Sequence, residues 1–160
     1  MYLFGTNEYI DYAVHTYSSS MLRAAFSVLH SSADAEDAVQ EAFIRLMTAC
    51  PQFHDSEHEK AWLLRVTINI ARNMRRSQSR RERQADIEIP CHQEIGRELL
   101  EAVLALPEKY STVVHLYYYE GYSIKEIARI LNLPPATVGT RIARGRNALR
   151  NAMKGEADYE

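Results

Sequence analysis

The residues with the clearest chemistry are arginines, asparagines and a tryptophan in a segment expected to be helical from about Glu59 to Arg76. Their spacing of three or four residues places them on one stripe of that helix. The stripe consists of Trp62, Arg65, Asn69, Arg72, Asn73 and Arg76. Arginine binds phosphate, asparagine reads base edges, and an aromatic ring gives an unpaired base a surface for stacking. The stripe therefore suits single-stranded or melting DNA better than a closed duplex.

Trp62 has a second interpretation, because large aromatic side chains are more often packed than exposed. The ring would then lie under the preceding polar loop of residues 51–60, and the two roles are compatible. The opposite side of the same helix is apolar. It is predicted to face the core through Leu63, Val66, Ile70 and Met74.

A second set of DNA-binding residue types follows near the C-terminus, on the latter of two short helices. Ser123 and Glu126 form the capping-box pattern that opens the first helix, and Pro135 begins the second after a three-residue turn. The two helices are expected to share a core made of Ile124, Ile127, Ala128, Leu131, Val138, Ile142 and Leu149. This is the spacing of a helix-turn-helix, in which the second helix enters the major groove.

The face of this second helix opposite the shared core is polar. It carries Thr137, Thr140, Arg141, Arg144, Asn147 and Asn151. The early residues are expected to reach bases, and the arginines to contact guanine edges or phosphates. A purely structural helix pair is a weak alternative, because it would not need two arginines on a face that packs against nothing.

An acidic amphipathic helix precedes both cationic segments. Ser31-Ser32-Ala33-Asp34 has the pattern of a helix N-terminus, and the apolar stripe that follows comprises Ala35, Ala38, Val39, Ala42, Phe43 and Leu46. The other half of the helix holds Asp34, Glu36, Asp37, Gln40 and Glu41. Taken alone, this pattern is typical of an ordinary solvated surface helix with acids near its positive end.

The net charge of −2 conceals strong segregation of charge along the 160 residues. Residues 1–64 hold three basic and nine acidic side chains, whereas residues 65–83 hold seven and one. Residues 84–120 are again acidic, and residues 121–155 again hold seven basic side chains and one acidic. Two separate basic blocks in an otherwise acidic chain indicate two places that meet a polyanion.

The elements that must position these residues are helices almost throughout, because glycine and proline are scarce and the apolar spacing is helical. We predict an all-α protein with a first domain over residues 1–76 and a second over residues 98–155. Ser18–His30 is expected to form the first helix. Residues 77–97 are polar and aperiodic, which predicts a flexible linker.

Several classes of protein and site are disfavoured. The chain has no glycine-rich phosphate loop and no nucleophile elbow, so we predict no catalytic residue, no cofactor and no enzymatic activity. Cys50, His54 and His58 lack an evident fourth ligand, which argues against a metal site. No apolar run approaches the roughly 20 residues of a membrane span, and residues 1–12 do not resemble a secretory signal. We therefore expect a cytoplasmic protein without membrane insertion.

Three segments together resemble the extracytoplasmic-function type of bacterial RNA polymerase sigma factor. DAEDAVQEAFIRLM resembles the polymerase-binding helix of that family, and AWLLRVTINIARNMRR resembles the segment that melts and captures the promoter −10 element. LPEKYSTVVHLYYYEGYS, with the helix pair after it, resembles the domain that binds the −35 element. The similarity runs from about residue 15 to residue 152, with the segments in the family's order.

The resemblance implies a role for each face. Asp34, Asp37, Gln40 and Glu41 would bind core RNA polymerase, with Asp37, Gln40 and Glu41 facing its basic residues. Trp62, Arg65, Asn69, Arg72, Asn73 and Arg76 would contact −10 DNA, with a pocket for a flipped base in the loop of about Gln52–Lys60. Thr137, Thr140, Arg141, Arg144 and Asn147 would contact −35 DNA. The family also implies an anti-sigma factor as a partner.

One departure from the family concerns Gly139, where a basic or polar residue is usual. Glycine lowers helix propensity and removes a possible phosphate contact there. The alternative function is a stand-alone helix-turn-helix regulator, which would explain the last helix pair but neither the acidic helix nor the stripe of Trp62. A pure protein-interaction module would not need two cationic faces.

Overall fold

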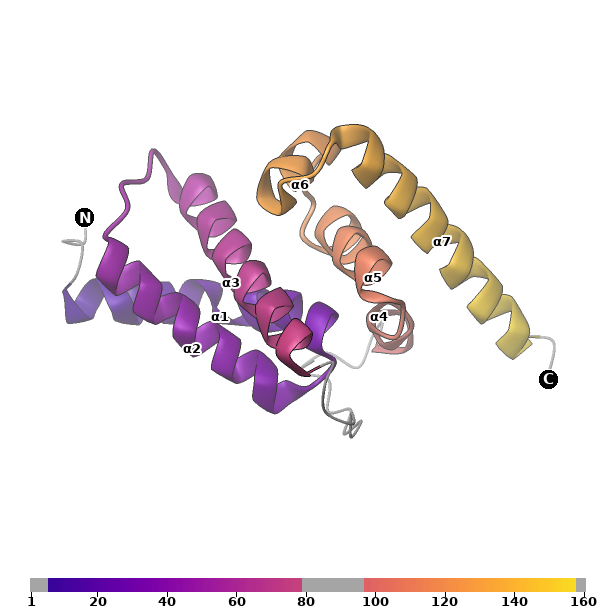
Figure 1. The fold of residues 1–160 in the computed structure, drawn as a ribbon, viewed down its shortest axis with the longest axis horizontal. Helices are drawn as coiled ribbons and strands as arrows, with labels where there is room; N and C mark the ends of the chain where they lie inside the picture. Colours follow the sequence, from indigo (N-terminus) through magenta and orange to yellow (C-terminus); the bar gives the residue numbers. More distant parts are fainter. Residues whose placement is uncertain (1–5, 79–96, 158–160) are drawn as a thin grey trace. The chain divides into compact units, whose positions relative to one another are not determined.

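The computed structural model describes residues 6–78 and 97–157, and throughout these ranges the regular structure is helical, with no strand. The all-α prediction is therefore confirmed. The chain divides into two compact units, residues 1–87 and 88–160, and the boundary between them lies outside the described residues. Figure 1 shows the three long helices of the first unit and the shorter helices and long final helix of the second. None of the helices in the described ranges has the length and apolarity needed to cross a membrane.

The first unit is a three-helix bundle in which each helix packs against the other two. It consists of α1 (Asn7–Leu29), α2 (Ser32–Ala49) and α3 (Ser56–Gln78). Alanines fill many of its most buried positions, and seven of them are fully inaccessible: Ala13, Ala24, Ala25, Ala35, Ala38, Ala42 and Ala71. Alanine combines the highest helix propensity with the smallest side chain that still covers the backbone, so the helices approach closely.

Local capping fixes the ends of α1 and α2. Thr6 and Ser31 are the N-caps, and the Ser31 hydroxyl oxygen accepts a hydrogen bond from the Asp34 amide at 3.3 Å. The predicted start of the acidic helix is therefore confirmed. Both helices end in a left-handed residue, His30 with φ 53° and Cys50 with φ 45°, whose amides donate back to Phe26 and Leu46.

Three sequence-based predictions for the first unit need correction. The first helix begins at Asn7 and not at Ser18, because Thr6 caps it and Tyr9, Ala13 and Tyr17 extend its buried face by about three turns. The helix α3 begins at Ser56, which shortens the predicted loop of residues 51–60, and it ends at Gln78, two residues into the predicted linker. Residues 79–96 of that linker lie outside the described residues.

The core face of α3 is also rotated slightly from the predicted one. Leu63 and Ile70 are buried as expected, whereas Val66 and Met74 remain partly exposed. Leu64, Thr67, Ile68 and Ala71 are buried in addition. Thr67 is polar and was not among the residues predicted to be internal. Its hydroxyl donates a hydrogen bond to the Leu63 carbonyl at 2.7 Å, so the buried polar group has a partner within the helix.

The second unit contains α4 (Arg97–Leu104), α5 (Glu108–Val114), a π-helical segment η1 (His115–Tyr119), α6 (Ile124–Leu131) and α7 (Pro135–Ala157). The capping box of Ser123 and Glu126 is present, with both hydrogen bonds made. Asn132 adopts a left-handed conformation with φ 53°, and Gly121 turns the chain before α6 with φ 77°. Pro107 is the N-cap of α5.

The shared core of α6 and α7 differs from the predicted one at its two ends. Ile127, Ala128, Leu131, Val138 and Ile142 are buried as expected. Two residues assigned to that core are more accessible: Ile124 is 37 % exposed and Leu149 is only partly buried. Ile130 is buried instead, since α6 packs against η1 as well as against α7.

The π-helical segment was not predicted. It continues directly from α5 and buries His115, whose ring stacks on Tyr119 with 5.1 Å between centroids. The His115 Nε2 lies 3.6 Å from Glu120 Oε1. Three consecutive tyrosines of this segment, 117 to 119, are exposed on the surface.

The close approach of α5 and α7 depends on Gly145. A Cβ atom at this position would lie 2.7 Å from Val114 Cγ2 and 3.2 Å from Tyr110 Cβ, closer than side chains pack. Gly139, six residues earlier on the same helix, offers the opposite case, because its Cβ would meet only Ile124 Cδ1, at 3.9 Å. Replacement of each glycine by alanine is therefore expected to have opposite effects on the stability of the protein.

Gly145→Ala is expected to destabilise the protein by about 1–3 kcal/mol through overpacking. Gly139→Ala is expected to stabilise it by up to about 1 kcal/mol, because alanine has the higher helix propensity and fits without a clash. Thermal unfolding of both variants followed by circular dichroism tests the pair. Equal effects of the two substitutions would show that α5 and α7 do not meet at Gly145.

Glu59 in the first unit predicts a dependence of stability on pH. Burial raises the pKa of its carboxyl group, and the hydroxyls of Tyr9 and Tyr17 offset part of that increase. A pKa that is higher in the folded than in the unfolded state means that the charged form opposes folding, and this cost is lost as the pH falls through the folded-state pKa. Glu59→Gln should therefore raise Tm at pH 7 and change it less near about pH 4. A constant difference in Tm across this range would contradict the assignment.

Candidate nucleic-acid interface

The outer face of α2 presents the acidic residues as the sequence indicated. All six residues of the predicted apolar stripe are buried, whereas Asp37, Gln40 and Glu41 are exposed. Glu41 forms a half-exposed ion pair with Arg45, at 3.6 Å, and such a pair contributes little to stability. Within residues 6–78 and 97–157, Asp37 and Gln40 form no side-chain hydrogen bond or ion pair, so these exposed side chains are available to another molecule.

Two apolar residues extend this face. Ile44 is 50 % exposed and Met47 is 45 % exposed, one and two turns beyond Gln40. Sequence reasoning missed both because they lie outside the polar run, although their helical spacing from Gln40 was visible. The exposed side of α2 is thus acidic in its first half and apolar in its second.

Asp34 differs from the other acids of α2. Its Oδ2 accepts a hydrogen bond from Gln78 Nε2 at 2.8 Å, which ties the start of α2 to the end of α3. The side chain is partly buried. The structure therefore gives Asp34 a role within the fold, and its predicted role in binding remains a proposal.

The polar stripe of α3 lies on one face, as predicted. Arg65, Asn69, Asn73 and Arg76 are exposed, while Trp62 and Arg72 are partly buried. Arg75, which belongs to the basic block but not to the stripe, donates from Nη1 to the Val28 carbonyl at 2.7 Å. That bond anchors the end of α3 to the end of α1 and so fixes the direction of the stripe.

The loop before α3 brings four rings together. Phe53 lies edge-on to Trp62 at 5.8 Å and to His58 at 5.4 Å, and His54 stacks on His58 at 5.3 Å. Trp62 therefore packs against the loop, in agreement with its second interpretation, and part of the ring remains accessible. The His54 amide hydrogen-bonds His58 Nδ1, and the described residues contain no group of three or more side chains suited to a metal.

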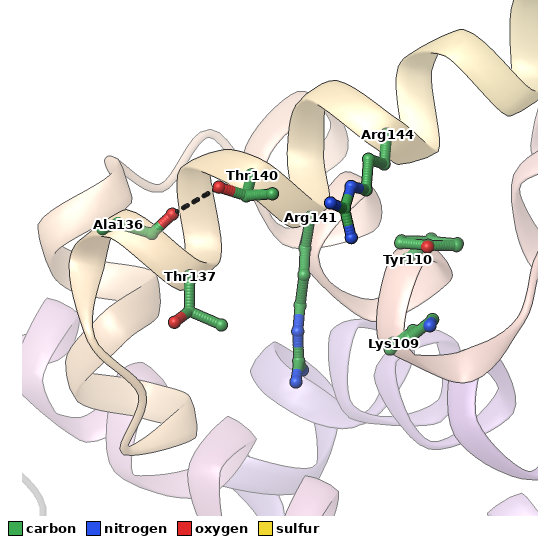
Figure 2. A pocket seen from close by; sticks show the side chains of 7 residues that line it. All are labelled: Lys109, Tyr110, Ala136, Thr137, Thr140, Arg141 and Arg144. Carbon is green, nitrogen blue, oxygen red and sulfur yellow. Dashed lines mark hydrogen bonds between the residues drawn. The ribbon is translucent and has the colours of Figure 1, made fainter.

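The predicted reading face of α7 borders a pocket that sequence reasoning did not find. Figure 2 shows Thr137, Thr140, Arg141 and Arg144 of α7 beside Lys109 and Tyr110 of α5. With Ala136 these residues line an open pocket of about 370 Å³. Lys109 and Tyr110 precede α7 by about 30 residues, so only tertiary packing brings them here. No pattern in the sequence indicated it.

Predicted residues of α7 are also exposed on the surface, both in the lining of this pocket and beyond it. Thr140 and Asn147 are exposed, and the Thr140 hydroxyl donates to the Ala136 carbonyl at 3.0 Å. Arg146 points elsewhere, since its Nη1 donates to the Tyr118 hydroxyl at 3.2 Å. Arg141 and Arg144 of α7 thus border the pocket, whereas Arg146 of the same helix contacts η1.

Comparison with known proteins places these faces in a family. The profile of sigma-70 region 2 matches residues 13–81, and that of sigma-70 region 4 matches residues 96–149. The extracytoplasmic-function RNA polymerase sigma factor SigW of Bacillus subtilis is 29% identical over 163 residues, covering 88% of this chain and 87% of SigW.

Two solved structures share the fold. The sigma factor RpoE of Bartonella quintana, in complex with the anti-sigma factor NepR, matches 93% of this chain and 98% of its own at 21% identity, with a TM-score of 0.76. CnrH, in complex with the cytosolic domain of CnrY, matches 94% and 91% at 23% identity, with a TM-score of 0.67. Since regions 2 and 4 of one family occur in order and together span most of the chain, this protein belongs to the sigma-70 family, among its extracytoplasmic-function sigma factors.

Proposed function

We propose that this chain binds core RNA polymerase through α2 and directs it to promoters through α3 and α7. The observation that carries the proposal is the presence of one acidic and two cationic or amide-bearing faces on a single chain, each exposed by the packing of the opposite apolar face. A stand-alone helix-turn-helix regulator would account for α6 and α7 but would leave the match to sigma-70 region 2 without a role.

The residue roles follow from position. On α2, Asp37, Gln40 and Glu41 would meet basic residues of the polymerase, and Asp34 would orient the helix. On α3, the exposed stripe would contact −10 DNA, with Trp62 at the point where the loop and the helix meet. On α7, Thr137, Thr140, Arg141, Arg144 and Asn147 would contact the −35 element. These assignments are supported by the partial or full exposure of the side chains and by the order of the two matched regions.

Further partners and properties are part of the same proposal. The solved structures of RpoE and CnrH are complexes with NepR, an anti-sigma factor, and with the cytosolic domain of CnrY. We infer that an anti-sigma factor also controls this chain. Its function is regulatory and non-enzymatic, and its place of action is the cytoplasm, where the polymerase and the chromosome are found.

The direct test of the proposed function is in vitro transcription with bacterial core polymerase and a library of promoter fragments. Addition of the chain is expected to produce transcripts from a subset of fragments that share two sequence elements. Core polymerase alone should not produce them. Transcription that is the same with and without the chain would refute the proposed function.

Charge reversal on α2 tests the polymerase contact. The double variant Asp37→Lys, Glu41→Lys should lose co-purification with core polymerase and keep a Tm close to that of the unaltered chain, because both side chains are exposed. The matched control is Glu8→Lys, Asp11→Lys, which makes the same change of charge at exposed positions of α1. Equal loss of binding in both variants would mean that net charge matters and the α2 face does not.

A comparison of free and polymerase-bound protein tests how the two DNA-binding faces act together. Each unit offers only a handful of cationic contacts, so each alone should bind DNA weakly at physiological salt. Polymerase would hold both units on the promoter and make the second contact effectively intramolecular. Footprinting is expected to show little specific protection by the free chain and clear protection by the holoenzyme. Strong protection by the free chain would identify an autonomous regulator.

A further inference from the structure

The pocket between α5 and α7 has the composition of an anion site. Lys109, Arg141 and Arg144 contribute three cations to its lining, and no carboxylate is among the residues that line it. Within the part of the chain that the structure describes, neither arginine is paired with a carboxylate. Cations that line one pocket without a counter-ion in its lining repel one another, and an anion bound there relieves that repulsion.

The pocket is built by packing and is not a chance gathering of long side chains. Gly145 lets α7 approach the backbone and Cβ of Tyr110 closely, which sets the distance between the two helices. The Lys109 ammonium lies over the Tyr110 ring, 4.9 Å from its centroid, so the ring holds the charge at the edge of the pocket. Figure 2 shows Lys109 and Tyr110 on the same side of α7 as Arg141 and Arg144.

We propose that this pocket binds a backbone phosphate of the −35 duplex, and that Lys109 is a further DNA-contacting residue. The inference rests on the proposed function, because it takes α7 as the helix that enters the major groove. Lys109 stands on α5 beside that helix, so its side chain would reach the sugar-phosphate backbone that borders the groove and not the base edges within it. Lys109 would therefore position α7 on the duplex without reading sequence.

The choice of phosphate over a protein carboxylate follows from the position of the site. Arg141 and Arg144 belong both to the pocket and to the reading face of α7. An anion in the pocket would consequently be bound next to the DNA that the same helix reads. A phosphate fixed by three cations would also set the register of α7 along the groove.

The test measures how holoenzyme affinity for a selected promoter depends on salt. Loss of one phosphate contact reduces the slope of log K against log salt by about 0.9 and weakens binding to different sequences by a similar factor. Lys109→Gln should show both effects, and Lys109→Arg should restore most of the slope. Lys154→Gln is the matched control, because it removes an exposed lysine charge from α7 at a position outside this pocket.

A scan with neutral methylphosphonate linkages locates the contact. At one linkage next to the −35 element, the neutral group should weaken the unaltered holoenzyme several-fold and leave the Lys109→Gln holoenzyme unchanged. An unaltered slope for Lys109→Gln, while Arg141→Ala still weakens binding, would overturn the pocket assignment alone. If the holoenzyme selects no promoter from the library, the proposed function fails and the inference fails with it.

Discussion

The burial of one apolar face on every helix is the constraint on which both units depend. In the three-helix unit the buried faces are rich in alanine, and seven alanines are fully inaccessible. Such small side chains allow close packing but give each helix only a narrow contact surface. Every helix of a small bundle must therefore leave its opposite side in solvent, and the chemistry of the protein is confined to those outer sides.

The outer sides are held in fixed directions by a few polar contacts at the helix ends. At the end of α3, Arg75 bonds the carbonyl of Val28 and Gln78 bonds Asp34, so the helix is tied to both of its neighbours. At its start, Trp62 packs on Phe53 of the loop. The exposed stripe between these anchors cannot rotate about the helix axis without breaking them. Contacts within the fold thereby fix the direction of the exposed side chains of this stripe.

Sequence reasoning succeeded where a feature is local and periodic. The apolar stripe of α2, the Ser31 cap and the capping box of Ser123 depend only on residues within a few positions, and all three are confirmed. It failed where packing decides. The first helix was predicted too short, and the turns that the prediction left out bury the rings of Tyr9 and Tyr17. The π-helical turn and the partnership of Lys109 with α7 leave no periodic pattern, since each depends on which helix lies opposite.

The segregation of charge explains how one small chain can address two kinds of partner. An acidic face on α2 favours a basic protein surface, whereas the cations of α3 and α7 favour phosphate. The net charge of −2 shows that the two signs nearly cancel over the whole chain. Long-range attraction of the free protein to DNA is therefore expected to be small, and we expect binding to depend on local clusters such as Lys109, Arg141 and Arg144. A chain with this distribution gains DNA affinity chiefly when another molecule covers its acidic face and brings its cationic faces to the duplex together.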